Sequence, residues 1–250
     1  MTAHEYLENV LNSHALNDWE VESLRNKRSE IETYLRSCFG QDITNFYYSG
    51  SIAKGTAIRL SYDLDLCVYF KRDSFDSLRD MYEQVYTKLD QRYSLEPKTV
   101  SIAIKGSNVD IVPARRIDET GVLVNLYRRD IDSQIQTSIS IHVKTISASG
   151  VRNIIKLIKI WKQRHNLHFK SFALELLVIK SLKDKVLDGY DNKVWEVLKY
   201  IRDDVLTVRL EDPANSNNVV SDVILGKDKQ AMTTQAIVSL NQGSWSDIIW

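Results

Sequence analysis

Two aspartates and an upstream glycine–serine pair are the residues in this chain best suited to chemistry. Asp63 and Asp65 are two positions apart, and side chains at that spacing in a strand point to the same face. Leu64 and the apolar residues that alternate with the acids predict the opposite, buried face. The turn at Gly50 and Ser51 is rich in backbone N–H groups, which suit phosphate, while paired carboxylates suit Mg²⁺. Together they predict a site for a Mg-bound triphosphate.

A third acid lies in a predicted hairpin further along the chain. Residues 99–104 alternate like a strand, residues 105–108 have the composition of a tight turn, and Asp110 lies in the next strand at 109–112. A single aspartate in a strand commonly lies on a solvated outer face, which is the competing interpretation for each acid taken alone. That interpretation is less convincing for three acids together, because carboxylates close to one another repel unless cations are present.

The ordered motifs resemble the DNA polymerase β-like nucleotidyltransferase superfamily. The pattern is Gly50-Ser51, then Gly55-Thr56, then Asp63-x-Asp65, and later an aspartate within Val-Asp-Ile-Val-Pro-Ala. Three later segments resemble the helical half of oligoadenylate synthetases and of the cGAS/DncV-like nucleotidyltransferases (CD-NTases), namely 156–161, 171–177 and the Asp-Pro…Asn-Asn segment at 212–219. The matches run from about Gly50 to Val219.

The resemblance implies catalysis with two divalent ions, Mg²⁺ or Mn²⁺. Transfer to a hydroxyl requires neutralisation of the triphosphate and an in-line arrangement of the attacking and leaving oxygens, and two metals provide both. Asp63 and Asp65 are expected to ligate both ions. Asp110 is expected to bind the ion near the acceptor hydroxyl and to favour its deprotonation. These three aspartates are therefore the predicted catalytic and metal-binding residues.

The resemblance also assigns nucleotide contacts. Gly50 and Ser51 are expected at the β- and γ-phosphates, where a Cβ at position 50 would block the approach. Lys159 corresponds to a lysine that grips the triphosphate, Ser171 to a further phosphate contact, and Phe172 to an aromatic residue that stacks on the base.

Each nucleotide contact has an ordinary structural alternative. Glycine–serine turns are common, and the basic stripe at positions 152, 156 and 159 of a predicted helix is typical of a solvated face. Phe172 taken alone favours a core position, as does Trp161. Lys54 either touches phosphate or is an exposed loop lysine. The segment 212–218 is rich in turn formers and taken alone predicts a surface loop.

Composition limits the functional classes. The formal net charge is zero, so general attraction to nucleic acid is not implied, yet no acidic residue occurs between Asp132 and Glu175 while basic residues do. No stretch approaches the roughly 20 apolar residues of a membrane helix, and the polar start lacks a signal-peptide core. Two cysteines form neither a disulfide framework nor a zinc site. We therefore expect a cytoplasmic protein that needs no membrane.

The predicted elements favour an α+β fold with two lobes. Strands concentrate in the first half and helices in the second, so residues 1–135 are predicted to form a nucleotidyltransferase lobe and 136–250 a helical lobe that completes a cleft. The predicted helices cover about 18–38, 74–93, 139–147, 151–165, 171–187, 191–203 and 228–241. The predicted strands begin at 46–48 and continue at about 61–70, 98–104, 108–113 and 121–127.

The resulting hypothesis is a template-independent nucleotidyltransferase that joins NTPs or dNTPs into a short cyclic or linear oligonucleotide and releases pyrophosphate. The resemblance implies a bacterial anti-phage role in which the product activates an effector protein, and it requires no long nucleic acid. One alternative is a polymerase of linear DNA or RNA oligomers. A second is a minimal antitoxin-type transferase that nucleotidylates a protein partner, and a non-enzymatic alternative is a nucleotide-binding antitoxin or interaction module.

Overall fold

A computed structural model describes residues 1–250, and its contacts divide the chain into two units. The unit that we call the sheet unit comprises Asn17–Lys54 and Tyr62–Val143. The unit that we call the helical unit comprises Met1–Leu16, Gly55–Ser61 and Lys144–Trp250. The two units interleave along the sequence, and the division predicted at residues 135 and 136 stays a prediction. No helix of the chain combines the length and apolarity needed to cross a bilayer.

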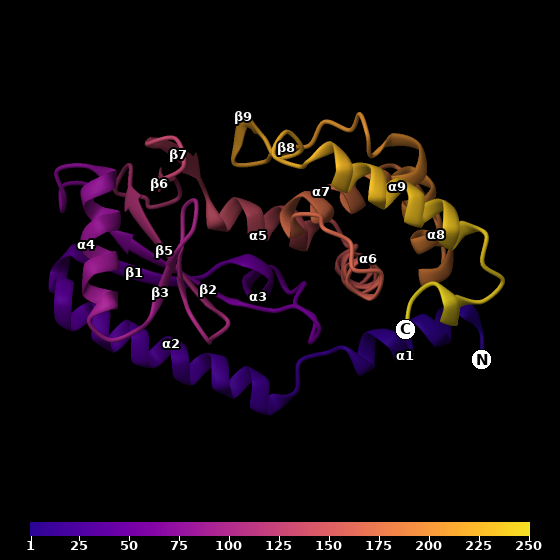
Figure 1. The fold of residues 1–250 in the computed structure, drawn as a ribbon, viewed down its shortest axis with the longest axis horizontal. Helices are drawn as coiled ribbons and strands as arrows, with labels where there is room; N and C mark the ends of the chain where they lie inside the picture. The colour runs from indigo at the N-terminus through magenta and orange to yellow at the C-terminus, as the bar shows by residue number, and fades with distance from the viewer. The chain divides into compact units, whose positions relative to one another are not determined.

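The sheet unit is built on one mixed sheet (Figure 1). Its main path runs β1-β2-β5-β4-β3, and β6 extends it from β5 to β7. The strands are β1 (Ile43–Tyr48), β2 (Leu64–Phe70), β3 (Leu95–Pro97), β4 (Ile102–Ile104), β5 (Val109–Arg116), β6 (Val124–Arg128) and β7 (Ser133–Thr137). The helical elements of this unit are α2 (Asp18–Phe39), η1 (Gly40–Asp42), α3 (Gly50–Lys54) and α4 (Leu78–Asp90), and α5 (Ile139–Ala148) begins in it.

The parallel pair of β2 and β5 is central to this sheet. Asp65 lies opposite Asp110, and Leu66 lies opposite Ile111. Because successive side chains of a strand alternate between faces, the leucines at 64 and 66 point away from Asp65, and both are fully buried. The predicted alternation of acids and apolar residues in this strand is therefore confirmed.

Helices α2 and α4 pack on this sheet and on each other. The first begins at a capping box, in which Asn17 and Glu20 each accept a backbone N–H bond from the other residue. The second begins at Ser77, whose side chain accepts from the N–H of Asp80. The apolar stripe of α4 is buried, namely Leu78, Met81, Val85 and Leu89.

The helical unit surrounds a second core. Trp161 is fully buried there, and its indole N–H donates to the Ser239 hydroxyl at 2.9 Å. Its core position was predicted from the sequence and is confirmed. The elements of this unit are α1 (Ala3–Ser13), α6 (Arg152–Arg164), α7 (Ser171–Leu182), α8 (Tyr190–Asp204), α9 (Gly226–Leu240), η2 (Trp245–Asp247) and the two-stranded sheet of β8 (Glu211–Asp212) and β9 (Asn215–Val219). Helix α1 packs on α6 and α8.

The sequence predicted most elements and missed some. Every predicted helix from α5 to α9 is present, with boundaries displaced by up to five residues. Helix α1 was missed, although Thr2 and Glu5 form a capping box there. The short strands β3, β7, β8 and β9 were also missed, because strands of two to five residues carry little periodicity.

Candidate active site

Three aspartates gather at one end of the β2–β5 pair. Asp65 is the second residue of β2, Asp63 precedes that strand by one residue, and Asp110 is the second residue of β5. The parallel register places Asp65 and Asp110 directly opposite each other, so their side chains share a face of the sheet. The structure thus brings together two of the predicted acids by strand pairing, and Asp63 joins them electrostatically.

The charges of these acids perturb one another. Burial raises the pKa of Asp65 to about 6, and the charges of Asp110 and Asp63 add to this effect. Burial also raises the pKa of Asp63, again with a contribution from Asp110. Both shifts have the sign expected for carboxylates crowded in a partly dehydrated place. The cluster therefore favours cations or protons at this end of the sheet.

Two lysines of the sheet unit lie within reach of these carboxylates. The Lys98 ammonium donates to both oxygens of Asp110, at 2.9 and 2.8 Å. Lys54, at the end of α3, is buried, and its charge lowers the pKa of Asp65. An exposed loop position for Lys54 is therefore wrong. Lys98 was not singled out from the sequence, because it precedes Asp110 by twelve residues and no local pattern links the two.

Gly50 is placed against Asp65. Its φ is +58°, and a Cβ at this position would lie 1.6 Å from Oδ2 of Asp65. Only glycine fits such an approach without displacing the carboxylate. The backbone N–H of Ser49 donates to the Asp65 carbonyl at 2.8 Å, and Ser51 follows in the first turn of α3. The segment predicted as a turn thus opens helix α3, and its glycine makes room for an acid.

The donor set fits divalent cations. No three His, Cys, Asp or Glu side chains already converge as a metal-binding group in this structure, and Asp110 is held by Lys98. Carboxylate oxygens are nevertheless the donors that Mg²⁺ prefers. Burial and then the charge of a neighbouring carboxylate raise the pKa values of Asp63 and Asp65, and a bound cation would oppose both effects. These residues are therefore suited to the ions that the sequence predicted.

Lys159 lies inside the helical unit rather than on a solvated face. Its amine donates to Glu175 at 2.6 Å and to the Thr56 hydroxyl at 3.0 Å. The side chains of Lys159 and Glu175 are 6% and 0% exposed, and Thr56 also donates to Glu175 at 2.6 Å. The three residues form a buried polar cluster that ties the segment after α3 to helices α6 and α7.

The other two cations of the predicted stripe are more accessible. Arg152 is exposed, and Lys156 is half-buried. Burial lowers the pKa of Lys156, and the charge of Arg152 adds to this effect. The guanidinium of Arg152 lies beside Gly55, where a Cβ would be 3.5 Å from Nη1. Neither cation has an ion-pair partner in the structure, so both are available to an anion.

Ser171 and Phe172 open helix α7. Ser171 is exposed at its first position, and Phe172 is half-buried and packs against the core of the helical unit. The ring is therefore neither fully buried nor free of the core, and its predicted contact with a base stays a prediction.

The Asp-Pro…Asn-Asn segment forms a hairpin rather than an irregular loop. Asp212 is buried, and its carboxylate accepts from the N–H of Ala214 at 2.8 Å and from the Asn218 amide at 3.1 Å. These bonds close the turn between β8 and β9. The motif thus stabilises local structure within the helical unit.

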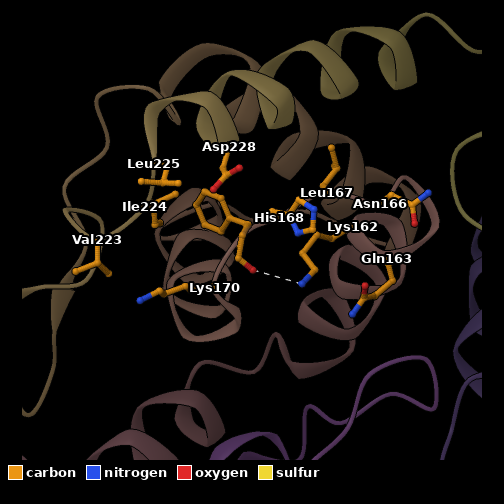
Figure 2. Close-up of a pocket in the computed structure, with 11 residues that line it drawn as sticks. Lys162, Gln163, Asn166, Leu167, His168, Lys170, Val223, Ile224, Leu225 and Asp228 are labelled. Atoms are coloured by element: carbon orange, nitrogen blue, oxygen red, sulfur yellow. Dashed lines mark hydrogen bonds between the residues drawn. The ribbon is translucent and has the colours of Figure 1, made fainter. Parts of the chain in front are cut away.

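A separate cavity of about 670 Å³ lies in the helical unit between the α6–α7 connection and the start of α9 (Figure 2). Lys162 lines it and donates to the Phe169 carbonyl at 3.3 Å, and burial lowers the pKa of this lysine. His168, Lys170 and Asp228 also line it. None of the predicted site residues lines this cavity, so it is distinct from the carboxylate cluster.

Two polar residues of the buried cluster were present in the quoted motifs but were given no role. Thr56 belongs to the glycine-rich segment, and Glu175 lies within Ser-Phe-Ala-Leu-Glu-Leu-Leu. A glutamate in a helix that is apolar on all sides is a usable signal, since such helices are buried and a buried carboxylate requires a partner.

The chain matches a known family and a characterised relative in sequence. Residues 1–125 match the family model described as the Second Messenger Oligonucleotide or Dinucleotide Synthetase (SMODS) domain. The chain is 27% identical over 230 residues to the cyclic AMP-AMP-AMP synthase of Escherichia coli (strain MS 115-1), a match that covers 81% of this chain and 72% of that protein.

The fold has solved relatives. The structure of the E. coli MS115-1 CdnC:HORMA-deltaN complex superposes with a TM-score of 0.77 at 22% identity, over 95% of this chain and 89% of that chain. The Elizabethkingia meningoseptica CdnE cyclic dinucleotide synthase, solved with GTP and Apcpp, gives 0.75 at 18% identity, over 97% and 100%. The α+β fold is thus the polymerase β-like fold of CD-NTases, and the chain belongs to the SMODS family, as a nucleotidyltransferase of the CD-NTase kind.

Proposed function

We propose that this protein joins nucleoside triphosphates, without a template and with Mg²⁺ or Mn²⁺, into a short cyclic oligonucleotide and releases pyrophosphate. The observation that carries the proposal is the facing pair of Asp65 and Asp110, with Asp63 beside them and Gly50 packed against Asp65. A cyclic product is favoured over a linear one because the E. coli relative is named a cyclic AMP-AMP-AMP synthase.

The chain's own residues divide the work of the transfer. Bound divalent ions supply charge neutralisation and in-line alignment. Asp63 and Asp65 are proposed to hold both ions, and Asp110 to hold the ion at the acceptor hydroxyl and so promote loss of its proton. Gly50 and Ser51 are proposed to lie against the β- and γ-phosphates. Pyrophosphate leaves when the acceptor oxygen bonds to the α-phosphorus.

The nucleotide contacts implied by resemblance belong to the same proposal. Lys159 is proposed to act on the triphosphate, Ser171 to bind phosphate and Phe172 to stack on a base. We add Lys156, because it lies on the same helix stripe as Lys159, is more accessible and has no ion-pair partner.

The biological role that we propose is signalling in bacterial defence against phage, in which an effector protein responds to the product. The CdnC relative has been solved in a complex with a HORMA protein, which supports a protein partner for this chain too. We place the reaction in the cytoplasm, where the triphosphates are available and where the two free cysteines stay reduced.

The direct test is to incubate the protein with all four NTPs and all four dNTPs, with Mg²⁺ or Mn²⁺, and to identify products by mass spectrometry. A cyclic oligonucleotide with pyrophosphate is the expected result. A linear oligomer in place of a cyclic one would indicate a polymerase. A mass increase on a protein would indicate a nucleotidylating enzyme. No product under any condition would contradict the proposed reaction.

Asp63→Asn and Asp65→Asn are each expected to lower product formation by more than about a hundredfold while the fold survives, because each removes a charge that metal and transition state require. Product yield and circular dichroism should be measured on the same preparations. Asp118→Asn, an exposed aspartate in the turn after β5, is the control and should retain full activity. Wild-type turnover in either active-site variant would refute the assignment.

The raised pKa of Asp65 predicts a pH dependence of folding without metal. The folded chain holds this proton more tightly than the unfolded chain, whose aspartates titrate near pH ~3.9. Asp65 therefore favours the folded state below about pH 4, and that contribution is lost as pH rises through about 6.

We expect Asp65→Asn to gain about 2–3 kcal/mol in the free energy of unfolding relative to wild type between pH 4 and pH 7. Urea unfolding in EDTA at several pH values measures this difference, and comparison with the variant cancels the titration of the groups that do not interact with Asp65. A difference that stays constant across the range would show that Asp65 is not perturbed.

Lys159 requires a test that separates folding from binding. Lys159→Ala removes the positive charge that pairs with the buried Glu175 carboxylate, and it should cost about 3–5 kcal/mol of stability. The double variant Lys159→Met/Glu175→Leu removes both charges and should restore most of that stability.

Calorimetry with a non-hydrolysable triphosphate then measures the contact. The double variant and Lys156→Ala are each expected to bind about ten- to a hundredfold more weakly, since a charge-assisted contact is worth about 1.5–3 kcal/mol. Unchanged affinity in the double variant would leave Lys159 with a purely structural role.

Phe172→Ala should raise the apparent KM for nucleotide, while Phe172→Tyr should be tolerated because any aromatic face can stack on a base. If the ring served only the core, the alanine variant would instead lose about 3–5 kcal/mol of stability. Thermal melting and kinetics on both variants distinguish these roles, and a large stability loss with normal KM excludes stacking.

A further inference from the structure

In the sheet unit, one lysine donates hydrogen bonds to both oxygens of a carboxylate that is predicted to bind metal. The Lys98 ammonium lies 2.9 Å from Oδ1 and 2.8 Å from Oδ2 of Asp110. The Asp110 side chain is 14% exposed, whereas that of Lys98 is 46% exposed. A nearly buried acid is therefore neutralised by a cation that reaches it from the solvent side.

The backbone of Lys98 is fixed while its side chain remains accessible. Its N–H donates to the Ser101 carbonyl at 2.9 Å, inside the β3–β4 hairpin. Its own carbonyl accepts from Nε of Arg129 at 3.4 Å. The hairpin thus fixes the backbone of Lys98. The long, half-exposed side chain can leave Asp110 by rotation of its own bonds at little cost.

The sheet leaves room for this reach. Ala103 of β4 lies opposite Asp110, which in turn lies opposite Asp65. These three positions form a row on one face of the sheet. A methyl group beside Asp110 leaves space above the strand for the lysine to approach the carboxylate.

The charge of Lys98 acts on the whole cluster. It counteracts the burial and carboxylate charges that raise the pKa values of Asp63 and Asp65. It thus does for the chain what a bound cation does, since it offsets the repulsion among the three acids. An ammonium that holds both oxygens of Asp110 also covers the positions through which that carboxylate can bind an ion.

We propose that Lys98 is an internal counter-cation of the carboxylate cluster, which pairs with Asp110 before metal binds and is displaced when a divalent ion takes Asp110. The inference rests on the proposed function, because it takes Asp110 as a metal ligand. Lys98 is thus a positioning residue: it keeps Asp110 in place and raises the metal concentration needed to load the site.

The test compares Lys98→Met, Lys98→Arg and the control Lys105→Met in the full chain without nucleotide. Lys105 is an exposed lysine in the β4–β5 turn. Titration with Mn²⁺ by calorimetry gives affinity, and thermal melting in EDTA and in Mn²⁺ gives stability. Methionine keeps most of the length of the unbranched side chain and removes the charge.

Lys98→Met is expected to bind Mn²⁺ about tenfold more tightly than wild type, because the competing charge-assisted bonds are gone. It should melt lower in EDTA and gain more on addition of Mn²⁺. Lys98→Arg should bind Mn²⁺ no more tightly than wild type, since arginine pairs with a carboxylate on both oxygens. Lys105→Met should match wild type in both measurements.

Equal or weaker Mn²⁺ affinity in Lys98→Met would overturn the inference. Its failure is distinguishable from failure of the proposed function, because the titration needs no turnover. Nucleotide synthesis by wild type together with an unchanged Mn²⁺ affinity in Lys98→Met rejects only the role of Lys98. Tighter Mn²⁺ binding in Lys98→Met without synthesis by any variant supports the role of Lys98 and rejects the proposed reaction.

Discussion

Repulsion among three carboxylates is the constraint around which the sheet unit is built. Like charges close together oppose folding unless cations or protons offset them, and burial together with the charges of Asp110 and Asp63 raises the pKa of Asp65 to about 6. Despite this repulsion, the parallel register of β2 and β5 places Asp65 directly opposite Asp110. The apolar residues that alternate with the acids supply the force, since both leucines beside Asp65 are fully buried.

The helical unit contains a different electrostatic feature, a buried ion pair. Lys159 and Glu175 are almost completely removed from solvent, and the desolvation of two charges can cost more than their attraction returns. Thr56 lowers that cost because its hydroxyl accepts from the lysine and donates to the glutamate. The cluster is best understood as a specific tie between α6, α7 and the segment after α3 rather than as a source of net stability.

The sequence predicted those features that depend on local pattern. Asp63 and Asp65 were found because a period of two and a glycine–serine pair are visible within about fifteen residues, and α6 and α7 were found from the helical patterning of residues 151–165 and 171–187. The burial of Lys159 was not predicted, because helical periodicity placed it on a basic stripe and its partner Glu175 lies in another helix. The hold of Lys98 on Asp110 was missed for the same reason: it is a side-chain contact across a sheet.

The glycine of the motif shows why a spacing can be informative when contacts are not. A Cβ at Gly50 would overlap an oxygen of Asp65, and the N–H of Ser49 already donates to the carbonyl of that aspartate. The end of β1 and the start of α3 are therefore fitted to the backbone and carboxylate of β2. Such a fit requires a particular residue type at a particular place along the chain, so it leaves a mark in the sequence. A lysine that reaches a carboxylate through a flexible side chain can start from many positions, so the sequence around it carries no such mark.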